Sequence, residues 1–328
     1  MQITALAGGT GAARFLRGLK LHLAGRQDDW RDAEISVVGN TADDITLFGL
    51  RVCPDLDTVM YTLGGGIDEV QGRGRTNESF TVREELAAYE VPPDWFALGD
   101  RDIATHIVRT QMLRAGWSLT EVTAALCARW QPGVDLIPMS DDPVETHVVV
   151  LDDDGTRQAL HLQEWWVREQ ASRPAQEFVF LGAQEAKPTL GVVDAISRAD
   201  VVLLPPSNPV VSIGAVLQVA GIGDAVRAAS APVVGVSPII GGAPVRGMAD
   251  ACLTGIGIET TASAVAAHYG ARLAGGLLDG WLVDDVDATS SGPAGVVQRS
   301  RGLVMSDPSA AADIAGAALD LAIELRRR

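Results

Sequence analysis

Four residues near the amino terminus have the composition of a phosphate-binding turn. Gly8-Gly9-Thr10-Gly11 follows an apolar run at 3–7 and precedes an amphipathic segment that contains Phe15, Leu16 and Leu19. Glycines at a strand-to-helix turn let a ligand approach backbone N–H groups that point along the helix dipole. The sequence is neither GxGxxG nor a Walker A loop, so it specifies neither a nicotinamide cofactor nor ATP. A tight turn that only packs the helix on the strand is the alternative.

Two acidic pairs follow this turn. Asp43 and Asp44 come after the second apolar run, and Asp55 and Asp57 precede a helical stretch at 58–63. Carboxylates at such positions cap helix amide groups, and for these residues alone capping is the better interpretation. Paired carboxylates close to a glycine turn also suit a Mg²⁺ ion that bridges a diphosphate.

A third polar group begins another predicted helix. Arg101 and Asp102 stand four residues before Thr105 and His106, a spacing that places each pair on one helix face. The group resembles a binding site. A solvated helix start, with Asp102 bonded to the first turn and His106 partly exposed, is the alternative.

Small polar residues also follow two later apolar runs. Ser207 and Asn208 come after the run at 201–204, and Ser237, Gly241 and Gly242 come after the run at 233–236. The carboxyl ends of parallel strands meet at one edge of a sheet, where ligands of open α/β sheets bind. We therefore expect these residues to line one crevice with the glycine turn.

The elements that must position these residues alternate between strand and helix. We predict an α/β fold with a Rossmann-like, doubly wound, mainly parallel sheet. Residues 1–63 and 176–328 form its nucleotide-binding core. Residues 64–175 form a largely helical insertion without parallel strands, which includes a hairpin at 146–151 and 158–162. Asp307 or Ser306 should cap a last helix that begins at Pro308.

The overall composition excludes several classes of protein. The chain has 328 residues, 47% of them hydrophobic, which is enough for a large core. Its net charge of −16 argues against nucleic-acid binding. Three well-separated cysteines fit reduced thiols in a cytoplasmic protein better than disulfides. No apolar run is as long as a membrane span, so we expect neither an anchor nor a signal peptide.

Seven segments within about residues 1–270 resemble, in the same order, the 2-phospho-L-lactate transferase family. The segments are long and unusual in composition, so the resemblance is specific. They are GGTGAARFLRGL, VGNTADD, VCPDLDTVMYTL, LGDRDIATHIVRT, LIPMSDDPVETHV, PPSNPVVSIG and SPIIGGAPVRG.

The resemblance implies a Mg²⁺-dependent (magnesium) transferase of coenzyme F420 biosynthesis. Such an enzyme moves a phosphoenolpyruvyl or 2-phospholactyl group from a guanosine-diphospho-activated donor to the 5′-hydroxyl of the deazaflavin Fo and releases GMP. It implies that Asp57 and Arg101 contact the deazaflavin, with a contribution from the insertion. It also implies that Gly8 to Gly11, Ser207, Asn208, Ser237, Gly241 and Gly242 surround the guanosine diphosphate.

The catalytic roles are hypotheses built on that resemblance. Mg²⁺ is held by Asp43, Asp44 or Asp57, and Asp57 and Asp44 are the catalytic candidates. One of these carboxylates, or His106, accepts the hydroxyl proton. Asp57, Arg101 and His106 are expected to bind substrate.

Three alternatives remain at this point. The chain could be a non-catalytic nucleotide-sugar-binding regulatory protein of related fold, although it has the PDLDT and GDRDIATH segments that such proteins lack. The donor could carry phosphoenolpyruvate or phospholactate. The tryptophan- and arginine-rich character of the chain resembles the actinobacterial-type members of the family, and that resemblance implies the phosphoenolpyruvate donor. The chain could form a homodimer, a common state of enzymes.

Overall fold

A seven-stranded parallel sheet forms the centre of the computed structural model, which describes residues 1–327. Its strands lie in the order β14-β13-β10-β9-β1-β2-β5, and every neighbouring pair is parallel. Their bounds are β1 Gln2–Ala7, β2 Glu34–Gly39, β5 Asp135–Pro138, β9 Val201–Leu204, β10 Val233–Val236, β13 Gly280–Val283 and β14 Val297–Ser300. The predicted α/β class with a parallel sheet is confirmed.

The chain reverses its direction of winding between β1 and β9. From β1 it proceeds outward through β2 to β5, and then returns to β9 and proceeds the other way through β10 and β13. Ala7 pairs with Gly39, and Gly39 with Pro138, so these strands end at the same level. Connections that leave two central strands in opposite directions open a crevice at their carboxyl ends, which is where ligands bind in such sheets.

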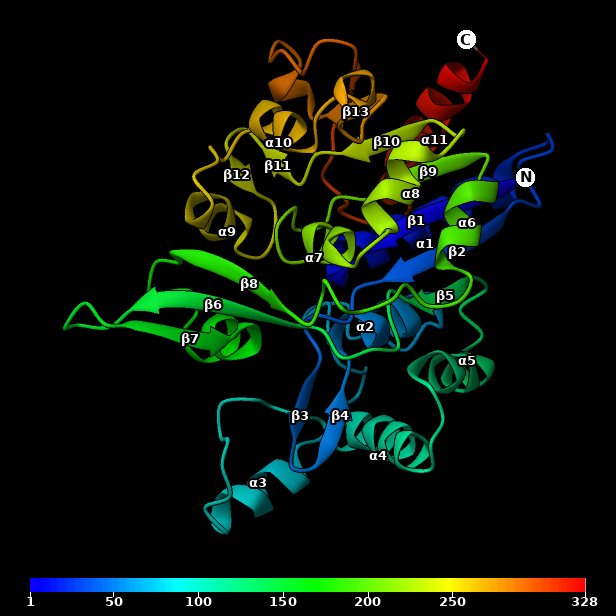
Figure 1. Ribbon diagram of the computed structural model, residues 1–328. Coiled ribbons are helices and arrows are strands. Elements are labelled where there is room, and N and C mark those ends of the chain that lie inside the picture. The colour runs from blue at the N-terminus through cyan, green and yellow to red at the C-terminus, as the bar shows by residue number, and fades with distance from the viewer. Residues whose placement is uncertain (328) are drawn as a thin grey trace.

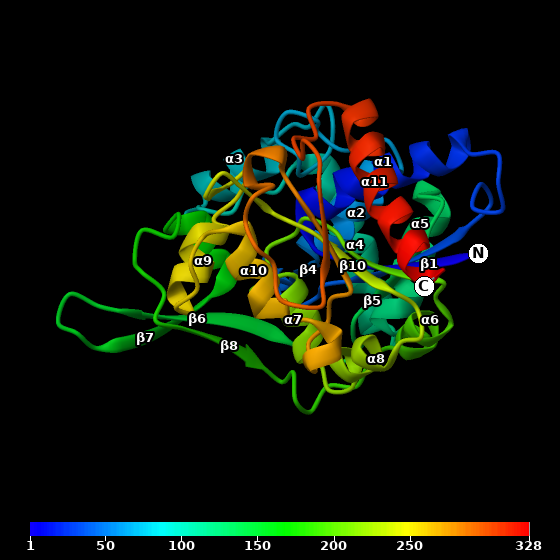
Figure 2. The same ribbon diagram turned by 90° about the horizontal axis from the view of Figure 1, so that it is seen from above.

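Helices cover both faces of the sheet because each strand alternates its buried side chains between two cores. Ala5, Val201 and Leu203 pack against one set of helices, whereas Leu6 and Val202 pack against the other. The two sets lie on opposite sides of the strands in Figure 2. The first set is α1 Gly9–Gly25, α2 Pro54–Leu63, α5 Leu119–Trp130 and α11 Pro308–Arg326. The second set is α6 Val192–Arg198, α7 Ile213–Gln218, α8 Ile222–Ala228, α9 Ala249–Gly255 and α10 Ala262–Tyr269.

Two smaller substructures extend from the carboxyl edge (Figure 1). One contains the hairpin of β3 Ile45–Leu47 and β4 Leu50–Val52, with α3 Thr81–Ala88 and α4 Asp100–Arg114. The other is an antiparallel sheet of β7 Arg157–His161, β6 Glu145–Leu151 and β8 Glu177–Leu181. A two-stranded ribbon, β11 Ile239–Ile240 with β12 Ala243–Pro244, follows β10.

Several local predictions are confirmed. The hairpin predicted at 146–151 and 158–162 is the β6–β7 pair. Asp307 caps α11, since its side chain accepts a hydrogen bond from the Ala310 N–H at 2.9 Å. Among residues 1–327, no helix is both long and apolar enough to cross a membrane.

The organisation of residues 64–175 differs from the prediction in one respect. This stretch was expected to lack parallel strands, yet β5 within it pairs with β2 at one edge of the central sheet. The run at 178–180, expected to begin the second half of the core, instead pairs antiparallel with β6 as part of β8. Both strands are short, and their partners are set by contacts distant in sequence that local patterns do not report.

The close packing of α1 on α11 depends on Gly18. A methyl group at Gly18 would lie 2.3 Å from the backbone carbon of Ala311, whereas one at Gly25, in the same helix, has no atom within 4 Å. Gly18→Ala should therefore lower the free energy of unfolding by about 1–3 kcal/mol, because helix backbones cannot move apart cheaply. Urea unfolding tests this, with Gly25→Ala as the control. Equal stabilities of the two variants would contradict this packing.

Candidate active site

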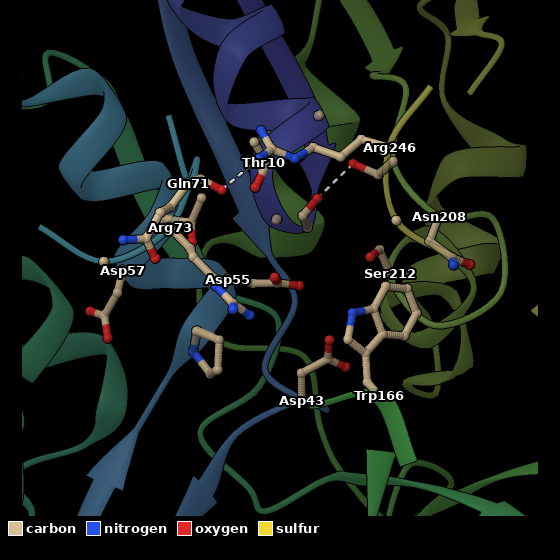
Figure 3. Close-up of a pocket in the computed structure, with 18 of the residues that line it drawn as sticks. Thr10, Asp43, Asp55, Asp57, Gln71, Arg73, Trp166, Asn208, Ser212 and Arg246 are labelled. Atoms are coloured by element: carbon tan, nitrogen blue, oxygen red, sulfur yellow. Dashed lines mark hydrogen bonds between the residues drawn. The ribbon is translucent and has the colours of Figure 1, made fainter. Parts of the chain in front are cut away.

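A cavity of about 930 Å³ lies at the carboxyl edge of the sheet, where the connections that leave the neighbouring strands β1 and β9 run in opposite directions. The turns that follow four neighbouring strands line it: Gly8 to Gly11 after β1, Asp43 after β2, Pro206 to Asn208 after β9, and Ser237 after β10. Figure 3 shows these walls with Thr10, Asp43, Asn208 and Ser212 around the open space. The predicted crevice is thus present, and Ser207, Asn208 and Ser237 line it together with the glycine turn, whereas Gly241 and Gly242 do not.

The glycine turn is held against the turn after β9. A Cβ at Gly11 would lie 2.2 Å from the Pro206 carbonyl oxygen, and one at Gly8 would lie 2.6 Å from Cβ of Ser212. Ser207 Oγ donates a hydrogen bond to the Gly8 carbonyl at 2.8 Å. Only glycine fits such contacts, so the close approach of the two turns requires glycine at positions 8 and 11.

Backbone and side-chain donors at this end of the cavity can receive an anion. α1 begins at Gly9 and has no side-chain cap, which leaves first-turn N–H groups directed at the cavity. The buried Nδ2 of Asn208 also has no hydrogen-bond partner among the described residues, while Asn208 Oδ1 accepts from the Val210 N–H at 2.9 Å. This end of the cavity is therefore suited to phosphate oxygens.

Asp43 and Asp55 form an acidic pair beside that anion site. Asn40 Nδ2 donates to Asp55 Oδ2 at 2.9 Å, whereas the buried Oδ1 of Asp43 has no partner in the described structure. Burial raises the pKa of Asp55 to about 7, an increase that the hydrogen bond from Asn40 limits. Burial and the neighbouring charge of Asp55 raise the pKa of Asp43 well above its usual range. A divalent cation would neutralise both groups, so this pair fits a Mg²⁺ site.

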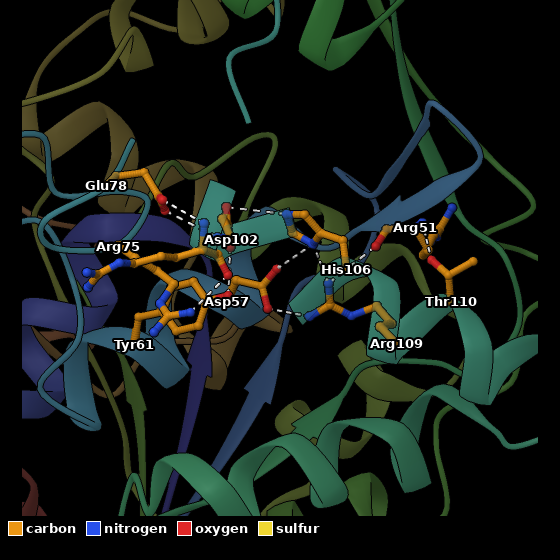
Figure 4. Close-up of polar contacts among 10 residues, drawn as sticks. Arg51, Asp57, Tyr61, Arg75, Glu78, Asp102, His106, Arg109 and Thr110 are labelled. Carbon is orange, nitrogen blue, oxygen red and sulfur yellow. Dashed lines mark hydrogen bonds and ion pairs between the residues drawn. The ribbon is translucent and has the colours of Figure 1, made fainter. Parts of the chain in front are cut away.

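Asp57 occupies the far end of the cavity in a different environment (Figure 4). Its Oδ1 is ion-paired with Nη2 of Arg109, and its Oδ2 is buried without a hydrogen-bond partner among residues 1–327. Burial raises the pKa of Asp57, and the charge of Arg109 opposes that rise. Asp57 is thus an oriented carboxylate with one oxygen left for a ligand.

His106 and Asp102 complete this cluster. Arg109 Nη1 lies 3.0 Å from His106 Nδ1, and His106 Nε2 lies 3.3 Å from Asp102 Oδ2. The hydroxyl of Tyr61 donates to Asp102 Oδ1 at 2.7 Å. Burial alone would raise the pKa of Asp102, but its contacts with His106 and Tyr61 hold it below the usual value. The pKa of Asp57 is therefore raised, whereas that of Asp102 is lowered.

The same three residues have ligand atoms close enough for a metal ion, within 4.8 Å of one another. Arg109, however, already contacts both Asp57 and His106 and brings a full positive charge into the cluster. A second cation there would be repelled by the guanidinium. No lysine or arginine within residues 1–327 forms an ion pair with Asp43 or Asp55, so this pair is the better candidate for a metal site.

Aromatic side chains line the cavity. Phe80, Trp95 and Phe96 come from the segment around α3, and Trp166, from the turn after β7, lies on the side of Asp43 and Ser212 (Figure 3). Arg75 stacks on Trp130 at 4.9 Å and lies 5.9 Å from the ring of Tyr61. Flat aromatic walls of this kind suit a planar ring system.

A loop from residue 68 to 75, here called the strap, lies across the anion end of the cavity. Thr10 Oγ1 donates to the Gly72 carbonyl at 2.7 Å, Arg14 to the Glu69 carbonyl at 3.0 Å, and Arg246 to the Gln71 carbonyl at 2.7 Å. Gln71, Arg73, Gly74 and Arg75 of the strap also line the cavity.

Ten of the candidate residues predicted from sequence line this one cavity. They are Gly8, Gly9, Thr10, Gly11, Asp43, Asp57, His106, Ser207, Asn208 and Ser237.

The other four lie outside the cavity wall. Asp44 is fully buried below it and pairs with Arg51 at 3.2 Å. Arg101 is exposed on α4, and Gly241 and Gly242 are exposed in the β11–β12 turn. Asp44 therefore cannot touch a ligand in this arrangement, because its neighbour Asp43 takes the position facing the cavity.

Sequence reasoning gave no site role to Tyr61 or Arg109, and it did not include Asp55 among the proposed metal ligands. Asp55 belongs to an acidic pair for which helix capping was preferred. Arg109 follows His106 by three positions in α4, a spacing that predicts a shared face, but no pattern in the sequence shows that this face is buried.

Comparison with known proteins places the chain among well-defined relatives. Residues 3–313 match the family described as 2-phospho-L-lactate transferase CofD. The phosphoenolpyruvate transferase of Thermobifida fusca (strain YX) is 65% identical and aligns over 100% of both chains. That of Streptomyces griseus is 61% identical over 99% of this chain and 100% of its own. That of Mycobacterium avium (strain 104) is 54% identical over 98% and 99%.

A solved structure supports the fold independently. The crystal structure of a UPF0052 family member from Bacillus halodurans superposes with a TM-score of 0.60 over 97% of this chain and 99% of that one. The sequence identity is 16%, so this likeness concerns the fold alone.

The acidic pair should make the ligand-free protein less stable as the pH rises. Because the folded-state pKa of Asp55, about 7, exceeds the ordinary value, its contribution to stability is complete below pH 4 and is lost as the pH rises through 7. Asp55→Asn should therefore stabilise the protein at pH 8 relative to wild type by on the order of 2 kcal/mol, but not at pH 4.

Denaturant unfolding at both pH values measures this difference. Asp153→Asn, at an exposed position in the β6–β7 turn, is the matched control and should leave the free energy of unfolding unchanged at both pH values. If Asp55→Asn were less stable than wild type at pH 8, burial of Asp55 would not raise its pKa as described.

Proposed function

Because the chain belongs to the 2-phospho-L-lactate transferase family, we propose that it transfers a phosphoenolpyruvyl group from a guanosine-diphospho-linked donor to the 5′-hydroxyl of the deazaflavin Fo, with release of GMP. The observation that carries this proposal is one cavity with an anion site at one end and the free oxygen of Asp57 at the other. The choice of phosphoenolpyruvate rests on the names of relatives 54–65% identical over nearly the whole chain.

The two ends of the cavity divide the substrates between them. The diphosphate of the donor lies against the uncapped start of α1 and Asn208, where the donors are backbone and amide N–H groups. The deazaflavin lies between the aromatic side chains near α3, with its hydroxyl toward Asp57. This arrangement brings a nucleophile and a phosphorus atom together without a covalent enzyme intermediate.

The reaction exchanges one phosphorus–oxygen bond for another. The hydroxyl oxygen of Fo bonds to the phosphorus that carries the enolpyruvyl group, while the bond from that phosphorus to the bridging oxygen breaks. The bridging oxygen and its electron pair leave with GMP. The hydroxyl proton passes to Oδ2 of Asp57, whose raised pKa favours proton uptake and which accepts no hydrogen bond from the described residues.

Mg²⁺ would be held by Asp43 and Asp55. When bound it would supply positive charge that offsets the charge of the diphosphate and of the departing GMP. Of the carboxylates first considered for this role, Asp44 pairs with Arg51 and Asp57 pairs with Arg109, so neither is proposed as a metal ligand. Asp44 also lies outside the cavity wall, and we propose no catalytic role for it.

The direct test incubates the protein with Fo, Mg²⁺ and either the phosphoenolpyruvyl or the phospholactyl donor. We expect GMP and a product whose mass corresponds to the enolpyruvyl form, which has fewer hydrogens than the lactyl form. Liquid chromatography with mass spectrometry measures both. Tight binding of a UDP-sugar without any GMP release in the presence of Fo would instead favour a nucleotide-sugar-binding regulatory protein.

Asp57→Asn should abolish most of the activity. The amide has the shape of the carboxylate but cannot take the proton, so kcat should fall by about 100-fold or more. Steady-state GMP release measures this, with Asp153→Asn as a control of equal charge change that should match wild type. A rate for Asp57→Asn close to wild type at saturating Mg²⁺ would remove Asp57 from the mechanism.

Mg²⁺ should stabilise the protein through Asp43 without any substrate. An ion that binds only the folded state raises Tm, here by about 2–5 °C at pH 8 and millimolar Mg²⁺. Differential scanning fluorimetry of wild type and Asp43→Asn tests this, and the variant should lose the increase. The same increase in both proteins would show that Mg²⁺ binds elsewhere.

A further inference from the structure

The three polar side chains of α4 nearest Asp57 form a network with a defined direction. Asp102, His106 and Arg109 come from one face of α4, Asp57 comes from α2, and the Arg51 carbonyl comes from β4 (Figure 4). Arg109 is 1% exposed and His106 is 1% exposed, so water does not compete for these contacts. Buried polar groups that exchange hydrogen bonds only with one another have few alternative arrangements.

The direction of the network follows from the chemistry of arginine. A guanidinium carries only N–H donors and never accepts a hydrogen bond. Since Arg109 Nη1 lies 3.0 Å from His106 Nδ1, that nitrogen has to be the acceptor. The imidazole is therefore neutral, with its proton on Nε2, which faces Asp102 Oδ2 at 3.3 Å. His106 Nε2 makes no hydrogen bond within residues 1–327, and Asp102 Oδ2 is the carboxylate oxygen that lies 3.3 Å from it. The other oxygen, Asp102 Oδ1, accepts from Tyr61.

This assignment decides which groups can receive a proton. His106 has no free lone pair, because Nδ1 accepts from Arg109 and Nε2 already holds a proton. His106 is thus excluded as the base for the acceptor hydroxyl, a role that the sequence had left open. Asp57 Oδ2 lies 3.8 Å from His106 Nδ1, too far for a hydrogen bond in this arrangement.

We propose that Arg109 is a positioning residue that keeps Asp57 Oδ2 free by locking His106 into its Nε2–H form. The inference rests on the proposed function for its kinetic consequence alone. Without Arg109, Nδ1 no longer has to accept a hydrogen bond, so a proton on Nδ1 can donate to Asp57 Oδ2, which lies within reach after a small rotation. The base would then be occupied, and the acceptor hydroxyl would have no group to receive its proton.

Arg109 also supports the carboxylate mechanically. Its Nη2 contacts Asp57 Oδ1, and its Nη1 reaches the Arg51 carbonyl at 3.3 Å. Thr110 accepts a hydrogen bond from the Arg51 N–H at 2.8 Å, so α4 holds the same residue of β4 on two sides. A role limited to this support would affect stability but would not set the position of a proton on His106.

The test reads the tautomer of His106 by NMR of protein labelled with ¹⁵N-histidine. The chain has five histidines, so the His106 signals are assigned by their loss in His106→Gln. Wild type should show a protonated Nε2 and an unprotonated Nδ1. In Arg109→Met we expect the Nδ1–H form to appear. Arg114→Met, an exposed arginine on the same helix, is the matched control and should leave the His106 spectrum unchanged.

Kinetics provide the second readout. In Arg109→Met, kcat should fall by about 100-fold with KM for the donor changed by less than about threefold, because the donor lies at the other end of the cavity. Arg109→Lys keeps the charge but cannot contact Asp57 and His106 together. Its kcat should therefore lie between those of wild type and Arg109→Met.

Each outcome decides the proposal. A wild-type His106 with its proton on Nδ1 overturns it, as does a folded Arg109→Met with an unchanged tautomer and an unchanged kcat. If Arg109→Met does not fold, the wild-type spectrum and Arg109→Lys still decide it. The wild-type tautomer needs no substrate, so failure of the proposed reaction and failure of this inference are distinguishable.

Discussion

The structure depends on one electrostatic constraint, the burial of several carboxylates in a single cavity. A buried ionised carboxylate is unfavourable unless hydrogen bonds or opposite charges compensate it. Asp57 is compensated by Arg109, Asp102 by His106 and Tyr61, and Asp55 only partly by Asn40. Asp43 Oδ1 has no hydrogen-bond partner within residues 1–327, and burial together with the charge of Asp55 outweighs the contact of Asp43 with Asn40. The carboxylates therefore fall into two groups. The charge of some is compensated within the protein, and the charge of the others would have to be compensated by a ligand.

The parallel sheet explains how these residues come together. Residues from four separate turns meet because parallel strands end at one edge, and the reversal between β1 and β9 opens that edge to a ligand. The segment between α2 and β6 then adds the aromatic wall of Phe80, Trp95 and Phe96, the strap and α4. In the proposed function, the core would bind the phosphates of the donor and the added segment would bind the acceptor.

The sequence predicted the parts of the site that local chemistry determines. The glycine turn and the turn at Ser207 and Asn208 follow from residue type and position after a strand, and both line the cavity. Asp57, which also lines it, was predicted from its acidic pair and from the family resemblance. Asp44 and Arg101 illustrate the limit, because adjacent residues such as Asp43 and Asp44 differ only in which one the turn directs inward. Arg109 could not be recognised for a related reason, since its burial depends on β4 and α2, which are distant in sequence. β5 was missed because its four residues carry too little pattern.

The central claim is that the acceptor alcohol lies beside Asp57 while the linked phosphates of the guanine nucleotide lie at the start of α1. A crystal structure with GDP, Mg²⁺ and Fo measures this most directly. The account predicts that the 5′-hydroxyl of Fo lies within hydrogen-bond distance of Asp57 Oδ2, with the diphosphate against the glycine turn. Fo bound outside the aromatic wall, or a diphosphate bound away from that turn, would contradict it.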